Sequence, residues 1–513
     1  MADGALTPES VQHRGILTVC AMVATLMQAL DSTIANVSLP YMQGSLAASY
    51  EEVTWVLTSY IVAAAIMTAP VGWLSTRFSE RRVFLVSLAG FTIASMLCGM
   101  ATSLDEMVLF RFAQGLFGAA LVPISQSVML NIYPLERRGQ AMAIWGMGVM
   151  VGPILGPTLG GYLTEHYDWR YVFFVNLPFG VLAILGVLFS MPGGKAQRSL
   201  TFDWFGFVFL AAALTGLQLM LDRGETKDWF ASTEVLTEAI VALFGFYVFI
   251  VHLCTAERPF ISPHMFADRN FAMALVIMFL VGMVLLATSA LLAPWLQELG
   301  NYPVETAGLL LAPRGFGTMA AMLIAGRLTN RIDARIIMFG GTLMLIATFW
   351  RMTGWTPAVS EFEIIWTSIL QGFGIGFVFI PLNVVAFATL PGELRTQGTA
   401  MWSLIRNVGS AVGISIFEAL ITTNAQVEHA ALSQFISPLN RALGWSDITA
   451  HALHTPQGIA MLGQMVDQQS QIIAYNDDFW LMMVIAVPIL ILLPFMRKPR
   501  AGGGDSGHAA VMD

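Results

Sequence analysis

The sequence predicts an all-α polytopic membrane protein with fourteen transmembrane helices. Fourteen separate apolar stretches are each about long enough to cross a hydrocarbon core of roughly 30 Å as a helix. The chain is 56% hydrophobic and only 11% charged, with a mean hydropathy of +0.69, so it has too few charges to coat a soluble surface of this size. Backbone amides in lipid must be bonded within their own segment, so stretches of this kind are helices.

The predicted spans are apolar runs separated by charged connections. The first six cover residues 16–36, 54–76, 83–102, 107–131, 140–162 and 171–191. Two more cover 203–222 and 234–254, and the last six cover 270–297, 305–328, 336–353, 361–389, 399–421 and 477–496. The connection at 422–476 is the only sizeable segment predicted outside the membrane.

Lysine and arginine are distributed unequally between alternate connections. If residue 1 is cytoplasmic, the inner segments hold seventeen of these residues and the outer segments five, while Arg111, Arg314 and Arg406 fall inside spans. A bias of this kind follows the positive-inside rule and predicts that both termini are cytoplasmic. The segment 422–476 is then expected on the periplasmic face of a bacterial inner membrane.

Three short matches indicate an internal duplication. Residues 72–77 (GWLSTR) are echoed by 326–331 (GRLTNR), Gln114-Gly115 by Gln371-Gly372, and 139–142 (GQAM) by 398–401 (GTAM), at offsets of 254, 257 and 259 residues. Spans 1 to 6 therefore match spans 9 to 14, and an even number of helices between the copies gives them the same orientation. The predicted units are 1–202, an inserted helix pair at 203–254, and 255–513.

Several motifs carry a family resemblance over nearly the whole chain. Residues 30–40 (LDSTIANVSLP), 111–115 (RFAQG) and 148–161 (GVMVGPILGPTLGG) resemble motifs of helices 1, 4 and 5 in the fourteen-helix drug:proton antiporters. Residues 169–180 (WRYVFFVNLPFG) and 221–230 (LDRGETKDWF) resemble the EmrB type in particular. The chain thus resembles the DHA2 (EmrB/QacA) branch of the major facilitator superfamily.

The resemblance implies proton-coupled multidrug efflux across the bacterial inner membrane by alternating access. It implies hydrophobic or amphipathic drugs as substrates, a periplasmic adaptor and an outer-membrane TolC-type channel as partners in a tripartite pump, and the proton gradient as energy source without a cofactor. One motif departs from the family. Thr76 stands where the family usually has Asp and Ser79 where it has Gly, so the charge-relay role of that Asp does not carry over.

Other function classes are less well supported. The chain has no G-x-x-x-x-G-K-[ST] motif, which argues against ATP as the fuel. No cluster at metal-ligand spacing falls in a predicted cavity, and we expect neither an enzyme nor a nucleic-acid partner. A stand-alone exporter, an importer of the same fold and a non-transporting receptor remain open, because direction rests on resemblance alone.

Asp31 is the best candidate for a group that changes charge inside the membrane. It lies about two thirds of the way along span 1, and an intramembrane carboxylate is expensive enough to imply a task. Arg111 in span 4 has a similar predicted depth, which permits an ion pair with Asp31. The alternatives are a permanently tied carboxylate and an arginine that bonds backbone carbonyls.

Small residues recur along span 5. Gly148, Gly152, Gly156 and Gly160 are spaced by four residues, which puts a stripe without side chains on one helix face and lets another helix approach closely. Pro153 and Pro157 remove hydrogen bonds within the same helix. A tight but bendable contact suits a helix that hinges in alternating access, and simple close packing is the alternative.

Further polar residues in the spans are candidates for lining a substrate cavity, although such residues are often interhelical contacts. They are Gln28, Asn36, Gln114, Gln126, Asn383, Arg314, Arg406 and Asn407. The segment 422–476 carries a polar run at 464–471, and loops of this length are usually functional or disordered. We expect it to dock the adaptor, with a solvated spacer as the alternative.

Overall fold

The computed structural model describes residues 13–194, 196–197, 199–436 and 455–497, and these residues form helices joined by short connections. The predicted first copy, termed the N-half, has six spans, some of them accompanied by short helices. They are α1 (Arg14–Ser45), α2 (Tyr50–Val53), α3 (Trp55–Thr68) with α4 (Val71–Phe78), α5 (Glu80–Met100), α6 (Leu104–Gly118) with α7 (Leu121–Ile132), α8 (Arg138–His166), and α9 (Tyr171–Phe174) with α10 (Asn176–Ser190).

The inserted pair and the second copy follow. The inserted pair is α11 (Trp204–Arg223) and α12 (Thr233–Thr255). The second copy, termed the C-half, comprises α13 (His264–Ala267), α14 (Arg269–Pro294) with the π-turn η3 (Trp295–Leu299), α15 (Val304–Leu328), α16 (Ala334–Met352), α17 (Glu361–Ala388), α18 (Arg395–Ser433) and α20 (Pro456–Leu492) with η6 (Leu493–Phe495).

Fourteen spans are present when the bent pair α3 and α4 is taken as one. Thirteen stretches of the described chain are long and apolar enough to cross a membrane, and α3 with α4 passes the same test with a bend of 56°. The bend falls at Pro70, whose ring removes a backbone donor and crowds the preceding turn. The predicted helical fold class is therefore confirmed.

Two helices in the C-half are much longer than their apolar sequence predicted. The segment 422–476 is not one long loop, because α18 continues to Ser433 and α20 begins at Pro456; residues 437–454 lie outside those described. At 1.5 Å per residue α18 is roughly 58 Å long, about twice the hydrocarbon thickness. Hydropathy locates only the apolar part, whereas a helix satisfies its backbone internally and continues into polar sequence.

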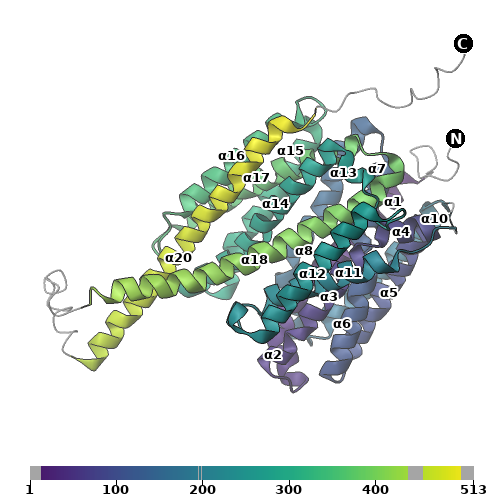
Figure 1. Cartoon of the computed structure of the whole chain (residues 1–513). Coiled ribbons are helices and arrows are strands. Elements are labelled where there is room, and N and C mark those ends of the chain that lie inside the picture. Colours follow the sequence, from purple (N-terminus) through teal and green to yellow (C-terminus); the bar gives the residue numbers. More distant parts are fainter. Residues whose placement is uncertain (1–12, 195, 198, 437–454, 498–513) are drawn as a thin grey trace, which may run out of the picture.

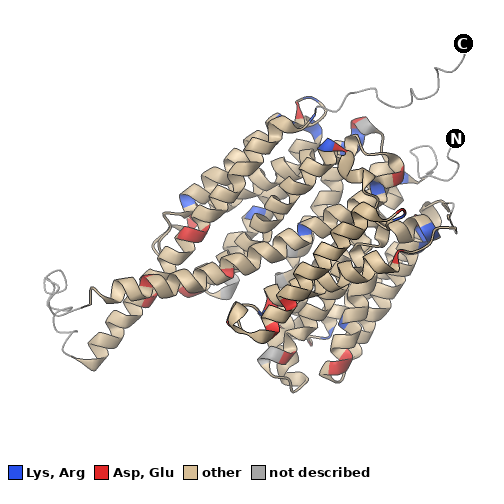
Figure 2. Ribbon diagram, in the orientation of Figure 1, with Lys and Arg blue, Asp and Glu red and all other residues tan. Residues whose placement is uncertain are grey.

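The ends of the two long helices project beyond the rest of the bundle as a pair (Figure 1). The described parts of α18 and α20 that fall within the predicted connection, residues 422–433 and 456–476, are termed the hairpin. The opposite end of the bundle, where α1 begins and η6 ends, is termed the termini side. Figure 2 shows that most Lys and Arg residues gather towards the termini side, while most Asp and Glu residues lie towards the hairpin side. This asymmetry agrees with the unequal charge count in the connections.

The two halves contact each other on the termini side. There α8 packs against α15, and α7 packs against α18. The contacts are a hydrogen bond between Ser127 and Thr396 (2.9 Å), one from Arg395 to Asn131 (3.0 Å), one from Thr396 to Glu80 (3.3 Å), and the backbone approach of Gly139 to Gly326. The bundle is closed at this end.

The inserted pair lies against the seam between the halves. Helix α11 packs on α3 of the N-half and on α18 of the C-half. Thr58 donates a hydrogen bond to Asp222, and Ser415 donates one to the carbonyl of Leu221 at 3.0 Å. The side chain of Thr422, in the hairpin, donates to Glu225 at 2.5 Å. These contacts tie α11 to both halves at the hairpin side.

Candidate functional site

Asp31 and Arg111 form a buried ion pair in the N-half. The Nη1 atom of Arg111 lies 2.7 Å from Oδ2 of Asp31, and both residues are 0% exposed. Asp31 lies closer to the middle of its helix than the predicted span 16–36 placed it, because α1 continues through Pro40 to Ser45. The apolar window ended at residue 36, but the backbone stays helical beyond it, so the charge pair lies deeper in the protein.

Neutral donors complete the bonding of the Asp31 carboxylate. The side-chain amides of Gln114 and Asn176 donate to Oδ1 at 2.8 and 3.3 Å. Each oxygen of the carboxylate therefore has at least one donor. A buried charge with a paired cation and further hydrogen bonds meets the conditions under which ionised groups are tolerated in an interior.

The Arg111 guanidinium is held on several sides. Its Nε donates to the carbonyl of Val56 at 3.1 Å, and Nη1 also donates to Oε1 of Gln114 at 3.0 Å. The guanidinium carbon lies 4.4 Å from the ring centroid of Tyr60. The predicted ion pair and the alternative of carbonyl bonding are thus both present. The planar guanidinium of Arg111 donates to the carboxylate of Asp31 and to the carbonyl of Val56 through different nitrogen atoms.

Three residues of this site escaped the sequence interpretation. They are Asn176, Tyr60 and Ser95, of which the last accepts a hydrogen bond from Asn176 at 3.0 Å while donating to the carbonyl of Phe173 at 2.8 Å. The available signal was a polar residue inside an apolar span, as for Asn176 in 169–180. That signal is weak for serine and tyrosine, which occur widely in membrane helices.

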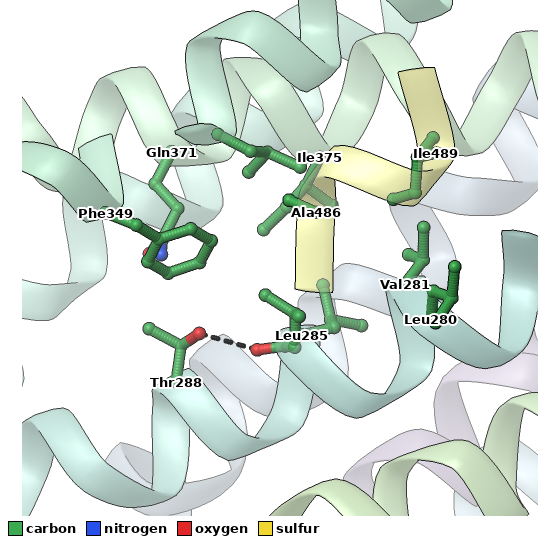
Figure 3. Close-up of a pocket in the computed structure, with 11 residues that line it drawn as sticks. Leu280, Val281, Leu285, Thr288, Phe349, Gln371, Ile375, Ala486 and Ile489 are labelled. Carbon is green, nitrogen blue, oxygen red and sulfur yellow. Dashed lines mark hydrogen bonds between the residues drawn. The ribbon is translucent and has the colours of Figure 1, made fainter. Parts of the chain in front are cut away.

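The predicted second copy has no such charge pair at the corresponding positions. At the 257-residue offset that relates Gln114 to Gln371, Thr288 corresponds to Asp31 and Ser368 to Arg111. Gln371 is 2% exposed, and its Nε2 has no partner among the described residues. Beside it lies a cavity of about 10 Å³ with mostly apolar walls from α14, α16, α17 and α20 (Figure 3). Such a cavity holds about one water molecule. Because Thr288 and Ser368 are neutral, this position has no charged group that could exchange a proton.

The glycine stripe of α8 packs against α1. A Cβ on Gly152 would lie 2.5 Å from the carbonyl carbon of Ala29, and one on Gly160 would lie 3.0 Å from the carbonyl oxygen of Ile34. A Cβ on Gly156 would meet Oγ1 of Thr33, and this hydroxyl donates to the carbonyl of Gly152 at 3.3 Å. A Cβ on Gly148 would be less crowded, at 3.4 Å from the carbonyl oxygen of Met22. The stripe therefore positions the turn of α1 that carries Asp31.

The side chains of Pro153 and Pro157 lie outside those described, although the backbone is helical at both positions. Whether these prolines bend α8 during a transport cycle stays a prediction. Among the described side chains, the close approach of α8 to α1 is accompanied by hydrogen bonds of Ser38 with Thr164 (2.8 Å) and of Trp145 with Thr25 (3.0 Å).

The structure distributes the other polar candidates over several places. Gln114 belongs to the ion-pair site, and Gln28 donates to the Tyr60 hydroxyl at its edge at 3.4 Å. Gln126 and Asn383 are buried and joined by a hydrogen bond between the halves. Arg314 donates to the carbonyl of Leu285 at 2.7 Å, Arg406 donates to its neighbour Asn407 at 3.4 Å, and both Asn36 and Asn407 are exposed.

Comparison with known proteins identifies the family. The family description Major Facilitator Superfamily matches residues 21–414, which include the ion pair and the glycine stripe. The chain belongs to the major facilitator superfamily. It is a multi-pass membrane protein of a transporter family.

Relatives of this superfamily member include proteins named EmrB. The chain is 34% identical over 499 residues to the multidrug export protein EmrB of Escherichia coli (strain K12), covering 96% of this chain and 97% of that protein. It is 32% identical over 500 residues to the fatty acid resistance protein FarB of Neisseria gonorrhoeae, again covering 96% and 97%. The predicted EmrB-type branch is thereby confirmed.

The fold also matches a solved structure. The human organic anion transporter MFSD10 (TETRAN) aligns with 93% of this chain and 99% of that chain, with a TM-score of 0.58 and 13% sequence identity. At this identity the likeness concerns the fold alone.

Proposed function

We propose that this protein exports hydrophobic or amphipathic drugs across the bacterial inner membrane in exchange for protons. Family membership and EmrB-type relatives over nearly the full length support the substrate class and the direction. The observation that carries proton coupling is the buried pair of Asp31 and Arg111, because an ionisable residue inside a membrane protein is a functional site by default. The proton gradient is then the only energy source required.

The chemistry of the exchange follows from the carboxylate. In the ionised form Asp31 is neutralised by Arg111 and bonded by Gln114. Protonation removes its negative charge, weakens the hold of Arg111 and loosens the contact between α1 and α6. Because α8 fits α1 along the glycine stripe, a change in α1 is passed to α8, which also packs on α15 of the other half.

The closed termini side corresponds to one state of alternating access. With the termini in the cytoplasm, as the distribution of basic residues favours, the conformation is closed to the cytoplasm and faces the periplasm. On α1, Gln28 is half-buried, while Ser32 and Asn36 are exposed, towards the hairpin side at a spacing of four residues. This row of polar residues supports a substrate path that opens in that direction.

Transport in membrane vesicles tests the proposal. Inverted vesicles containing the protein are expected to accumulate a cationic dye when the interior is acidified, and to lose that accumulation when a protonophore collapses the gradient. Dye uptake driven by ATP without a proton gradient, or dye movement only in the opposite direction, would contradict the proposal. Dye binding without dye transport under any gradient would favour the alternative of a non-transporting receptor on the same fold.

The hairpin is proposed as the docking surface for a periplasmic adaptor of a tripartite pump. Its two helices meet where Nε2 of His429 lies 3.2 Å from Oδ1 of Asp467, and Leu462 and Val466 are buried. On the outer faces Met461 and Met465 are 58% and 52% exposed. Methionine side chains are flexible and can adapt to the surface of a partner. Exposed apolar side chains on a helix outside the membrane are typical of a protein–protein contact.

Replacing the exposed methionines is expected to separate adaptor binding from transport. The double change Met461→Glu and Met465→Glu should reduce co-purification of the adaptor at least tenfold, because it puts charge into an apolar contact. Dye transport in inverted vesicles should stay within twofold of the unchanged protein. The matched control is Gln464→Glu, an exposed polar residue of the same helix, which adds charge without removing apolar surface. Normal adaptor binding by the double variant would contradict docking on the hairpin and favour α11 and α12 with their connection at 222–234.

A further inference from the structure

The C-half contains a buried carboxyl group that the ion-pair site does not use. Asp478, on α20, is 1% exposed, and neither of its carboxyl oxygens has a hydrogen-bond partner among the described residues. Its sequence neighbour Asp477 is exposed, so the burial is specific to one face of the helix. The predicted last span begins at residue 477, so these two carboxylates are its first two residues.

The surroundings of Asp478 are apolar and acidic. One turn before it, Tyr475 is buried, and Phe479 packs on Trp355, with ring centroids 6.2 Å apart. The indole N–H groups of Trp295 and Trp355 are also buried without an acceptor in the described chain. Unpaired donors and unpaired acceptors thus occur in one region near the hairpin side of the C-half.

The charged groups around this region do not neutralise a carboxylate. Asp477 lies next along the helix, and Glu298 of η3 and Glu418 of α18 act electrostatically on Tyr475, as Asp478 itself does. On α16, which also packs against α20, Arg351 is bonded to Glu363 at 2.6 Å. An ionised Asp478 would therefore be a buried anion among other acids, without a counter-charge or a donor, which is a strongly unfavourable state.

We propose that Asp478 carries a proton in this conformation and is a second proton-exchange site of the transporter. The two carboxyls then have opposite protonation states in one structure. Asp31 is ionised beside Arg111, while Asp478 is a neutral acid without a basic partner among the described residues. The step is a simple exchange, in which the O–H bond of the acid breaks, the proton passes to a water molecule, and the carboxylate is reprotonated from water later in the cycle.

The location suits release towards the hairpin side. Asp478 lies on α20, which packs against both α14 and α18, and these two helices bear the Gly282, Gly409 and Gly413 contacts. A Cβ on Gly409 would lie 2.5 Å from the carbonyl oxygen of Phe279, so α14 and α18 are in backbone contact. A shift of α20 against α14 or α18 would admit water or a substrate cation to Asp478 and favour its ionised form. This inference rests on the proposed proton coupling.

Infrared spectroscopy on the purified protein tests the protonation directly. The unchanged protein at neutral pH is expected to show the carbonyl stretch of a buried carboxylic acid, and Asp478→Asn should remove that band. Asp477→Asn is the matched control and should leave it, because that side chain is exposed. Since a neutral amide replaces a neutral acid of nearly the same shape, Asp478→Asn should also keep the thermal unfolding midpoint. Spectra without a band that depends on Asp478 would overturn the proposal.

Proton counting then separates this inference from the proposed function. In proteoliposomes, Asp478→Asn is expected to lower the number of protons moved per drug molecule by one while drug exchange continues. An unchanged ratio would exclude Asp478 as an exchange site and leave the drug–proton exchange itself intact. If Asp31→Asn also leaves drug-induced proton movement unchanged, the proposed coupling through the N-half fails instead.

Discussion

Substituting Asp31→Asn is expected to abolish proton-driven drug accumulation in inverted vesicles, to the level of vesicles without the protein. The amide has nearly the shape of the carboxylate and still offers an oxygen to Arg111, but it cannot cycle between charged and neutral forms. The measurement is dye uptake under an imposed pH gradient, with protein quantity in the membrane determined in parallel. Asp105→Asn, at an exposed acid in the first turn of α6, is the matched control and should transport normally.

A double variant separates loss of coupling from loss of structure. The single change leaves Arg111 buried without its counter-charge, and removing one partner of a buried ion pair destabilises a protein by about 3–5 kcal/mol. Adding Arg111→Gln removes the unpaired cation and should recover much of the thermal stability without recovering transport. Gradient-driven accumulation by either variant at the unchanged rate would show that the proton is exchanged elsewhere.

Gly152→Leu is expected to have the second largest effect, because it places a bulky side chain where α8 touches the backbone of α1. A Cβ alone would lie 2.5 Å from the carbonyl carbon of Ala29, and overpacking of this kind costs about 1–3 kcal/mol and sometimes more. We expect a lower unfolding midpoint in detergent and at least tenfold slower transport, since the displaced turn of α1 carries Asp31.

The same helix supplies a control for bulk. A Cβ on Gly161 would meet only Cγ1 of Val37 at 3.9 Å, which is ordinary contact, so Gly161→Leu should be tolerated in both measurements. Gly156→Leu is expected to fall between the two, because the nearest atoms belong to the Thr33 side chain and the nearest backbone atom, the Ile34 nitrogen, would be 3.4 Å away. Equal behaviour of the variants at 152 and 161 would contradict a close helix contact along the stripe.

The sequence by itself predicted the membrane class, the fourteen spans and the duplication, and it permitted the pair of Asp31 with Arg111 without deciding it. These features depend on local composition, on spacing, and on the rarity of charge in apolar segments, all of which are visible along a single chain. The glycine stripe of α8 was likewise visible, since its period of four residues defines one helix face.

Only the tertiary structure decided which helix lies against that stripe, which amides bond to Asp31, and which carboxyl is left without a partner among the described residues. Asn176 and Tyr60 reach the ion pair from helices far apart in the sequence, and Asp477 and Asp478 are adjacent in the sequence but one is exposed and the other buried. The length of α18 and α20 was also hidden, because hydropathy measures transfer into lipid while helix formation needs only internal hydrogen bonds. Side-chain partners depend on how helices are rotated against one another, and composition along a single chain does not contain that rotation.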